Sequence, residues 1–199
     1  SWDDSENKSK RGTYSNPVIN YSLPDPSIIE GEDGYFYLYA TENIRNLPIH
    51  RSKDLVHWNF VGTAFTDKTR PAFEPKGGLW APDINKIGDK YVLYYSMSVW
   101  GGEWTCGIGC ATADKPEGPF KLLSQYKYDP EDAGDDGIYN DAGVLVDDDG
   151  RVYIYAGHDE CPAPQERYVM NEWCVFSSSD LKTWTEHPVP LKAKDFAWA

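Results

Sequence analysis

Short runs of aromatic and β-branched residues, separated by Gly, Pro and Asp, make up most of the chain from Asn16 onward. Within residues 35–40, alternation places three tyrosines on one face of a strand and Phe36, Leu38 and Ala40 on the other. This alternation predicts β-strands, and the 3.6-residue period of a helix is almost absent. We therefore expect an all-β fold whose sheets have apolar neighbours on both faces.

The strand pattern repeats along the chain. Three strands follow Gly-containing turns and carry a tyrosine at the same place, at Tyr39, Tyr95 and Tyr155, which lie 56 and 60 residues apart. A Ser-x-Asp-Leu turn before a Trp also recurs, in residues 52–58 and 179–184. A four-stranded antiparallel unit of this length is typical of a propeller blade. The alternative is a two-sheet sandwich, which has short strands but no fixed repeat.

The repeat predicts how the chain divides into units. We expect a flexible tail over residues 1–15 and a partial β-propeller over 16–199, with blades at about 16–70, 71–125 and 138–190. Propellers have at least four blades, so about three blades predict an incomplete or spliced chain. Open blade edges would then favour self-association.

Composition narrows the classes of partner. Hydrophobic residues form 40% of the chain and aromatic residues 15%, which is enough for a packed core. A formal charge of −13 disfavours binding to nucleic acid, because phosphate backbones are also negative. No run of 18 apolar residues is present, so no membrane span is expected. No signal peptide is visible, and Ser1 is not a natural start, so a leader removed earlier is compatible with the sequence.

The four cysteines do not form a zinc motif, since the chain has no CxxC pair and only four histidines. Cys106 and Cys110 fall in one predicted strand, about 13 Å apart, which is too far for a disulfide between them. We expect these two to be buried thiols. Cys161 and Cys174 can close a loop only if the compartment is oxidising. No metal ligands are predicted.

Carboxylates recur in the register of the repeat. Asp25 and Asp141 are 116 residues apart, and so are the turn glycines Gly34 and Gly150. The inner strand of each propeller blade begins at the central channel, so Asp25 and Asp141 should converge there, with Asp83 near the same point of the middle unit. Carboxylates that lie close together in this channel raise each other's pKa, because their negative charges repel. A suitably spaced pair is what glycoside hydrolysis requires, one activating water and one protonating the leaving oxygen.

Each candidate residue also has an alternative interpretation, in which its role is structural. Asp25 can be a turn residue set by Pro26, and Asp141 can form an Asx turn or cap a strand. Asp83 fits a structural role or a peripheral sugar contact better than a catalytic one. Residues 147–150 fit a solvated hairpin tip better than a calcium loop. Core packing is the expectation for two tryptophans, Trp58 and Trp184.

Several of these motifs together resemble glycoside hydrolase family 43, which contains arabinanases, α-L-arabinofuranosidases and β-xylosidases. The resemblance covers the chain from Asn16 to its end. Residues 16–124 are most similar to an endo-arabinanase and residues 138–199 to a β-xylosidase or arabinofuranosidase, which is compatible with a splice near 125–137. The motifs are Pro-Asp-Pro-Ser-Ile (24–28), Ser-Lys-Asp-Leu-Val-His-Trp (52–58), Gly-Leu-Trp-Ala-Pro-Asp-Ile (78–84), Asn-Asp (140–141) and the hairpin 146–155.

The resemblance implies a five-bladed propeller that hydrolyses with inversion. Asp25 matches the general base. Asp141 matches the Asp that orients the general acid and tunes its pKa, although Asp-Ala stands here where the family usually has Asp-Pro. Trp80 matches a residue lining the sugar site. The family's acid is a Glu of the fourth blade, and Glu160 is the only nearby stand-in.

The expected function follows from these matches. We predict an inverting glycosidase acting on arabinan or arabinoxylan, of secreted or periplasmic origin. The predicted substrate-binding residues are Trp80, Asp83, Asn140, His158 and Glu160. His158 also fits a hydrogen-bonded loop residue. No cofactor is required, and a structural calcium in the central channel is compatible with the resemblance. The alternative is a non-catalytic carbohydrate-binding or inactive partial propeller that lacks the general acid.

Overall fold

The computed structural model describes residues 13–99, 106–126, 138–159, 170–192 and 195. These residues form twelve β-strands, as the alternation predicts. The strands are β1 (Ser27–Glu30), β2 (Phe36–Tyr39), β3 (Pro48–Ser52), β4 (Asn59–Thr63), β5 (Gly78–Ile87), β6 (Lys90–Ser98), β7 (Cys106–Ala113), β8 (Lys121–Tyr126), β9 (Ile138–Val146), β10 (Val152–Asp159), β11 (Met170–Ser178) and β12 (Thr185–Lys192).

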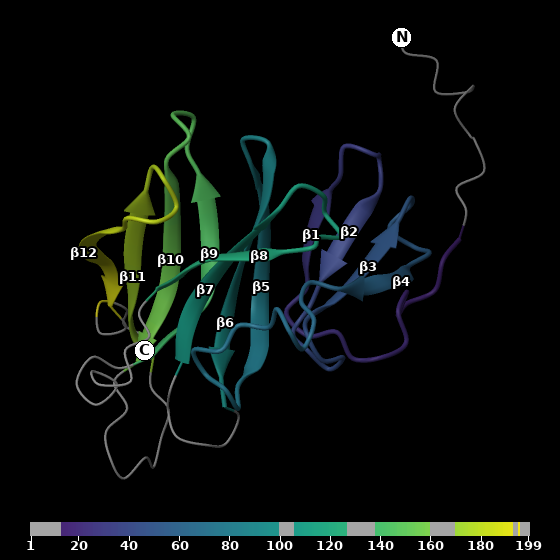
Figure 1. Cartoon of the computed structure of the whole chain (residues 1–199), viewed down its shortest axis with the longest axis horizontal. Coiled ribbons are helices and arrows are strands. Elements are labelled where there is room, and N and C mark those ends of the chain that lie inside the picture. The colour runs from purple at the N-terminus through teal and green to yellow at the C-terminus, as the bar shows by residue number, and fades with distance from the viewer. Residues whose placement is uncertain (1–12, 100–105, 127–137, 160–169, 193–194, 196–199) are drawn as a thin grey trace.

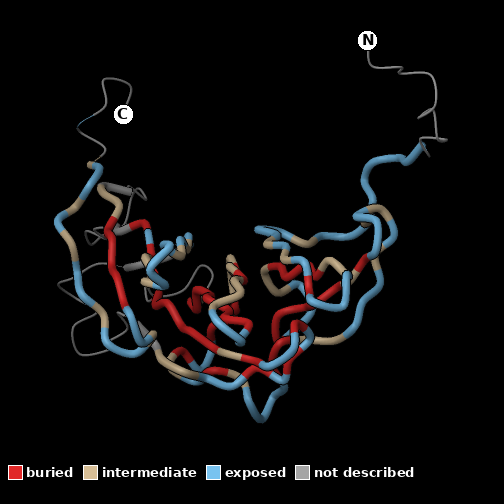
Figure 2. Tube along the Cα trace, turned by 90° about the horizontal axis from the view of Figure 1, so that it is seen from above, coloured by how far each residue is buried: buried red, intermediate tan, exposed pale blue. Residues whose placement is uncertain are grey.

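The strands form three antiparallel sheets of four, each in sequence order: β1–β4 (blade I), β5–β8 (blade II) and β9–β12 (blade III). The sheets stand side by side in Figure 1, and Figure 2 shows that they follow one another along an arc. Their strands span residues 27–63, 78–126 and 138–192. The prediction of an all-β fold is therefore confirmed. Three successive sheets along an arc also exclude the two-sheet sandwich.

Two separate cores hold the arc together. Blades I and II meet through one cluster, in which Tyr37 and Tyr39 pack with Leu93 and Tyr95. Blades II and III meet through a second cluster that includes Tyr94, on the opposite face of β6. Blade II is thus buried on both faces, as expected for a sheet between two neighbours. Each buried side chain of this size contributes roughly 1.5–3 kcal/mol through the hydrophobic effect.

The repeated Ser-x-Asp-Leu turn has the same hydrogen bonds in blades I and III. Ser52 Oγ accepts the Leu55 N–H at 2.9 Å, and Ser178 Oγ accepts the leucine N–H three residues later at 2.8 Å. The following Asp54 and Asp180 each accept two further backbone N–H groups. These N–H groups hold the pKa of both carboxyls well below the usual range. The repeat therefore begins one residue earlier in blade III than the sequence motif suggests.

Other local predictions also have clear outcomes. Residues 147–150 form the tight turn between β9 and β10, closed by the Gly150 N–H on Asp147 O at 2.8 Å. The hairpin-tip interpretation is therefore confirmed. Cys106 and Cys110 are buried thiols, and so is Cys174, whereas Cys161 lies outside the described residues. In the described part of the chain, no helix has the length and apolar character of a membrane span.

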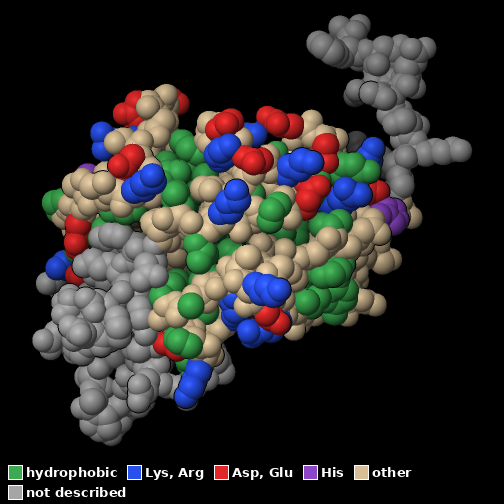
Figure 3. Space-filling model, viewed as in Figure 1, with side chains coloured by type: hydrophobic (Ala, Val, Ile, Leu, Met, Phe, Trp, Pro, Cys, Tyr) green, Lys and Arg blue, Asp and Glu red, His purple; other side chains and the backbone are tan. Residues whose placement is uncertain are grey.

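The outward faces of blades I and III are partly apolar and open. Ile28 and Phe60 are exposed on blade I, and Leu145 and Tyr155 on blade III. Acidic and basic side chains are intermixed over the face seen in Figure 3. Self-association through open blade edges stays a prediction.

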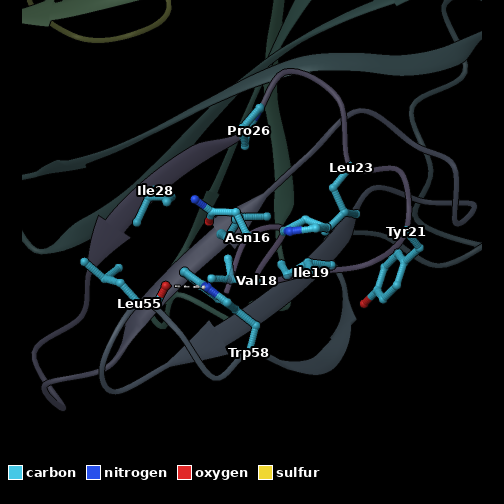
Figure 4. A pocket seen from close by; sticks show the side chains of 11 residues that line it. Asn16, Val18, Ile19, Tyr21, Leu23, Pro26, Ile28, Leu55 and Trp58 are labelled. Carbon is cyan, nitrogen blue, oxygen red and sulfur yellow. Dashed lines mark hydrogen bonds between the residues drawn. The ribbon is translucent and has the colours of Figure 1, made fainter. Parts of the chain in front are cut away.

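A cavity of about 720 Å³ lies against blade I, where the segment 16–23 crosses over the sheet (Figure 4). Trp58 is half-buried in its wall and donates its indole N–H to Leu55 O at 3.0 Å. Trp184, by contrast, packs edge-on against Tyr94 with ring centroids 6.2 Å apart, as part of the core between blades II and III. Core packing thus describes Trp184 better than Trp58.

We predict that Gly109→Ala lowers the free energy of unfolding by about 1–3 kcal/mol, a typical cost of overpacking. Gly109 pairs with Tyr95, and a Cβ at Gly109 would lie 2.3 Å from Tyr95 Cζ inside the core. Gly143→Ala is the matched control, because Gly143 pairs with the exposed Tyr155 and its Cβ would meet nothing within 4 Å. Urea unfolding measures both variants. Equal stability of the two would contradict the prediction.

Candidate active site

The backbone has the same unusual conformation at one point in each blade, two residues before β1 and at the fourth residue of β5 and of β9. Asp25, Ala81 and Asp141 all adopt the left-handed conformation, with φ of 51°, 40° and 51°. Their spacings of 56 and 60 residues equal those of the repeated tyrosines. Non-glycine residues rarely adopt this conformation, and Asp is among those that tolerate it best. The blade II counterpart of the two aspartates is therefore Ala81, and Asp83 lies two residues further along.

The three predicted carboxylates nevertheless line one pocket. It measures about 320 Å³ and lies where β1, β5 and β9 run side by side. Each blade contributes three consecutive residues to its wall, which are Asp25, Pro26, Ser27, Ala81, Pro82, Asp83, Asp141, Ala142 and Gly143. The convergence expected from the repeat is thus present in the structure.

Thr41 links Asp25 to the neighbouring blade. Its Oγ1 donates to Asp25 Oδ2 at 2.6 Å and accepts the Ala81 N–H at 2.8 Å. Its own N–H donates to Pro24 O at 2.9 Å. Asp25 is otherwise exposed to the pocket. Sequence reasoning missed Thr41, although its place just after a repeated aromatic strand puts it at the same edge as Asp25.

We predict that Thr41→Val destabilises the protein by about 1–3 kcal/mol, because the Ala81 N–H loses its acceptor. Valine keeps the shape of threonine and removes only the hydroxyl. Thr41→Ser is the control, since it keeps the hydroxyl and should cost clearly less. Thermal or urea unfolding provides the comparison. A Val variant as stable as the Ser variant would show that the hydroxyl does not link the blades.

Asp141 is held by its backbone while its side chain is open to the pocket. Its N–H donates to Ser96 Oγ of blade II at 2.9 Å. The surrounding protein removes part of the water from its carboxyl, and the negative charge of Asp25 adds to this effect. Both causes raise the pKa of Asp141 above the usual value for Asp. The two aspartates are therefore close enough to interact electrostatically.

Asp83 is half-buried, and its two oxygens accept hydrogen bonds from neighbouring strands. Val144 N–H of blade III donates to Oδ2 at 2.8 Å, and Ser27 Oγ of blade I donates to Oδ1 at 3.4 Å. Burial raises the pKa of Asp83, although these hydrogen bonds and one from Asn85 oppose the rise. Through these contacts Asp83 joins the three blades at the wall of the pocket.

Trp80 lies in β5 and is half-buried, but it is outside the wall of the carboxylate pocket. Its indole packs against Gly78, where a Cβ would come within 2.6 Å of Trp80 Nε1 and 3.4 Å of Glu42 Oε1. Glu42 forms a bidentate ion pair with Arg70, whose Nη2 and Nη1 donate to Oε1 and Oε2 at 2.5 and 2.8 Å. Sequence reasoning did not find this pair, which stands beside the predicted sugar-site tryptophan.

The remaining predicted residues cannot be placed as side chains. Asn140 pairs with Gly157 between β9 and β10, and His158 follows on β10, but both side chains lie outside the described residues. Glu160 is also outside the described residues. Among the described residues, no group of three or more His, Cys, Asp or Glu side chains could hold a metal ion. A structural calcium in the central channel stays a prediction.

The pocket in Figure 4 is the larger of the two, but its wall is mostly apolar and contains no carboxylate. The smaller pocket, where three carboxylates meet, is therefore the candidate site for acid–base chemistry. The model of the family described as "Glycosyl hydrolases family 43" matches residues 14–170. The chain belongs to this family. The resemblance seen in the motifs is confirmed, and the family match covers the first part of the chain and reaches residue 170 of the second.

Relatives and solved structures agree with this family. The chain is 29% identical to a xylan 1,3-β-xylosidase of Vibrio sp. over 92% of its own length and 37% of the relative's. It is 29% identical to an extracellular endo-α-(1→5)-L-arabinanase of Thermotoga petrophila, over 67% of the chain and 33% of the relative. The chain thus spans about a third of the length of these relatives.

The crystal structure of a thermostable family-43 glycoside hydrolase superposes with a TM-score of 0.63 and 27% identity. The superposition covers 91% of this chain and 58% of that one. The three sheets are therefore blades of a partial propeller of the five-bladed type that this family has.

Proposed function

We propose that this family 43 chain carries the general base of an inverting glycoside hydrolase that acts on arabinose- or xylose-containing polysaccharides. The observation that supports the proposal is the convergence of Asp25 and Asp141 from equivalent backbone positions of blades I and III into one open pocket. A pair of carboxylates flanking the scissile bond is the usual machinery of glycoside hydrolysis.

Asp25 is the proposed base. Thr41 holds its Oδ2, which leaves the second oxygen to accept a proton from water. As that proton moves to Asp25, the water oxygen bonds to the anomeric carbon from the face opposite the leaving group. The glycosidic C–O bond breaks at the same time, and the configuration at the anomeric carbon inverts.

Asp141 is proposed to assist the protonation of the leaving oxygen. The leaving oxygen needs a proton from a general acid, which inverting enzymes place about 6.5–9.5 Å from the base. In this proposal a nearby Asp141 carboxylate orients that acid and raises its pKa by like-charge repulsion. No residue in the described part of the chain is assigned as the acid.

The substrate class follows from the relatives. One is named for a xylan β-xylosidase activity and the other for an extracellular arabinanase activity. Neutral pentose polymers also suit an acidic protein, because they carry no phosphate that its charge of −13 would repel. A secreted or periplasmic location is part of the proposal, as plant polysaccharides lie outside the cell.

The test uses substrates that differ in their need for a general acid. Arabinan and arabinoxylan require protonation of the leaving oxygen. Dinitrophenyl glycosides of arabinose, arabinobiose and xylose do not, because dinitrophenolate is a stable anion that departs without a proton. The proposal predicts that the chain hydrolyses at least one dinitrophenyl pentoside, while a dinitrophenyl glucoside is inert. Absence of turnover on every pentoside would contradict it.

The alternative is a carbohydrate-binding propeller without catalysis. The observation in its favour is that no general acid is assigned among the described residues. Isothermal titration with arabino- and xylo-oligosaccharides distinguishes the two. Saturable binding together with inert dinitrophenyl pentosides would support the binding module.

A further inference from the structure

The carboxylate of Asp83 lies where the inner strands of all three blades meet. It belongs to β5 and accepts the Val144 N–H of β9 on one oxygen and the Ser27 hydroxyl of β1 on the other. Ser27 Oγ in turn accepts the Ile84 N–H of β5 at 3.2 Å. One side chain thus ties blade I and blade III to blade II.

These contacts are placed next to the proposed catalytic pair. Ser27 lies two residues after Asp25 on β1, and Val144 lies three residues after Asp141 on β9. β1, β5 and β9 belong to three different sheets, and β5 and β9 each shift register beside the pocket, between Trp80 and Asp83 and opposite residues 155–157. No ladder of backbone hydrogen bonds joins β1 to β9, so the distance between Asp25 and Asp141 depends on contacts between the sheets.

We propose that Asp83 is a positioning residue that sets the separation of Asp25 and Asp141 by holding β1 and β9 against β5. Its consequence for catalysis rests on the proposed function, but its effect on the separation of the two carboxylates does not. A carboxylate suits this task because both of its oxygens accept hydrogen bonds. Asparagine has only one acceptor oxygen, so it can hold Val144 or Ser27 in the native way but not both.

The same geometry argues against Asp83 as a catalytic residue. Both of its oxygens are engaged by protein groups, and Asn85 Nδ2 adds a third contact at 3.3 Å to Oδ1. Asp25, by comparison, is exposed to the pocket and has one hydrogen bond from a side chain. Misplacement of a reacting group by about 1 Å can cost a hundredfold in rate, so a residue that sets this spacing matters without touching substrate.

The titration of Asp141, followed by carbon-13 NMR of its carboxyl group, reports on the separation of the Asp25 and Asp141 carboxylates. Its pKa is raised partly by the charge of Asp25. Asp25→Asn removes that charge and should lower the pKa of Asp141. If the strands separate, the repulsion weakens and more water reaches Asp141, so Asp83→Asn should also lower this pKa. Ser27→Ala cuts one of the two links without changing any charge and should lower it by a smaller amount.

Asn85→Ala is the matched control, because it removes a hydrogen bond to Asp83 from the same strand and none from another blade. The pKa of Asp141 should stay at the wild-type value in this variant. An unchanged pKa of Asp141 in Ser27→Ala and in Asp83→Asn would overturn the proposal, and Ser27→Ala alone decides it if Asp83→Asn fails to fold.

Two further results separate this inference from the proposed function. If Asp25→Asn leaves the pKa of Asp141 unchanged, the two carboxylates do not form a pair and the proposed function itself fails. With an active preparation, Asp83→Asn should lower kcat on a dinitrophenyl pentoside about 10–100-fold with little change in KM. A rise in KM with kcat unchanged would instead make Asp83 a substrate contact and overturn the positioning role.

Discussion

Replacing Arg70 by methionine is expected to lower the free energy of unfolding by about 3–5 kcal/mol, the usual cost of breaking a buried ion pair. The Arg70 and Glu42 side chains are only 7% and 11% exposed. Arg70 also donates to Gly77 O at 2.6 Å and to Asn46 Oδ1 at 3.1 Å. Removing the guanidinium leaves the Glu42 charge buried with backbone donors in place of its cation, among them the Asn46 N–H at 2.8 Å.

Arg45→Met is the matched control. Arg45 pairs with Asp67 at 2.8 Å, but these side chains are 64% and 75% exposed. Exposed pairs typically contribute about 0–1 kcal/mol, so this variant should unfold near the wild-type midpoint. Urea unfolding at neutral pH compares the two substitutions. Similar small losses in both would show that burial does not make the Arg70–Glu42 pair more stabilising than an exposed pair.

The cost of Arg70→Met should shrink as the pH falls through the ordinary pKa of a glutamate, 4.5. In the wild type, burial would raise the pKa of Glu42, but hydrogen bonds from Arg70 outweigh it and the pKa lies below that ordinary value. The stability from this group is present above the ordinary pKa and is lost as the pH falls through the lowered folded value. In the variant, unpaired burial raises the folded pKa, so acid relieves the destabilisation. A difference in unfolding free energy that stays constant from neutral pH to well below the ordinary pKa would contradict this explanation.

Asp25→Asn is expected to lower the rate of hydrolysis of a dinitrophenyl pentoside by about 10²–10⁴-fold, the usual contribution of a general base. Asparagine tolerates the left-handed backbone at φ 51° and can still accept the Thr41 hydrogen bond. The substitution therefore removes the basic oxygen and leaves the backbone conformation unstrained. Alanine would add backbone strain to the chemical change.

Two controls sharpen this prediction. Asp141→Asn should cost much less than Asp25→Asn on a dinitrophenyl pentoside, because that substrate does not need the acid that Asp141 is proposed to orient. On arabinan the two losses should become comparable. Asp149→Asn changes an exposed carboxyl at the hairpin tip and should leave both rates unchanged. Equal rates for Asp25→Asn and the wild type would remove Asp25 from the mechanism.

The sequence predicts the blades well because their signal is local. Alternating side chains and turn residues report directly on strands and hairpins, and the regular spacing of Tyr39, Tyr95 and Tyr155 reveals the repeated unit. The same register predicts that Asp25 and Asp141 occupy equivalent positions of their blades, and their shared left-handed backbone confirms it.

Other features of the site depend on contacts between distant segments. Residue type matches Asp83 with the aspartates of the other blades, whereas the register assigns that place to Ala81. The pairing of β5 with β6 shifts between Trp80 and Asp83, and such an irregularity is not visible in the sequence. The contacts of Thr41 and Arg70 join residues far apart in the chain, so neither alternation nor spacing indicates them.

The configuration of the first product tests most directly whether Asp25 is the base of an inverting hydrolase. Proton NMR during the hydrolysis of dinitrophenyl α-L-arabinofuranoside or its arabinobiose analogue distinguishes the two anomers before they equilibrate. An inverting reaction with Asp25 as base predicts that the β-anomer of the released sugar forms first, and that Asp25→Asn abolishes its appearance. First formation of the α-anomer, or a β-anomer released equally fast by Asp25→Asn, would contradict this role.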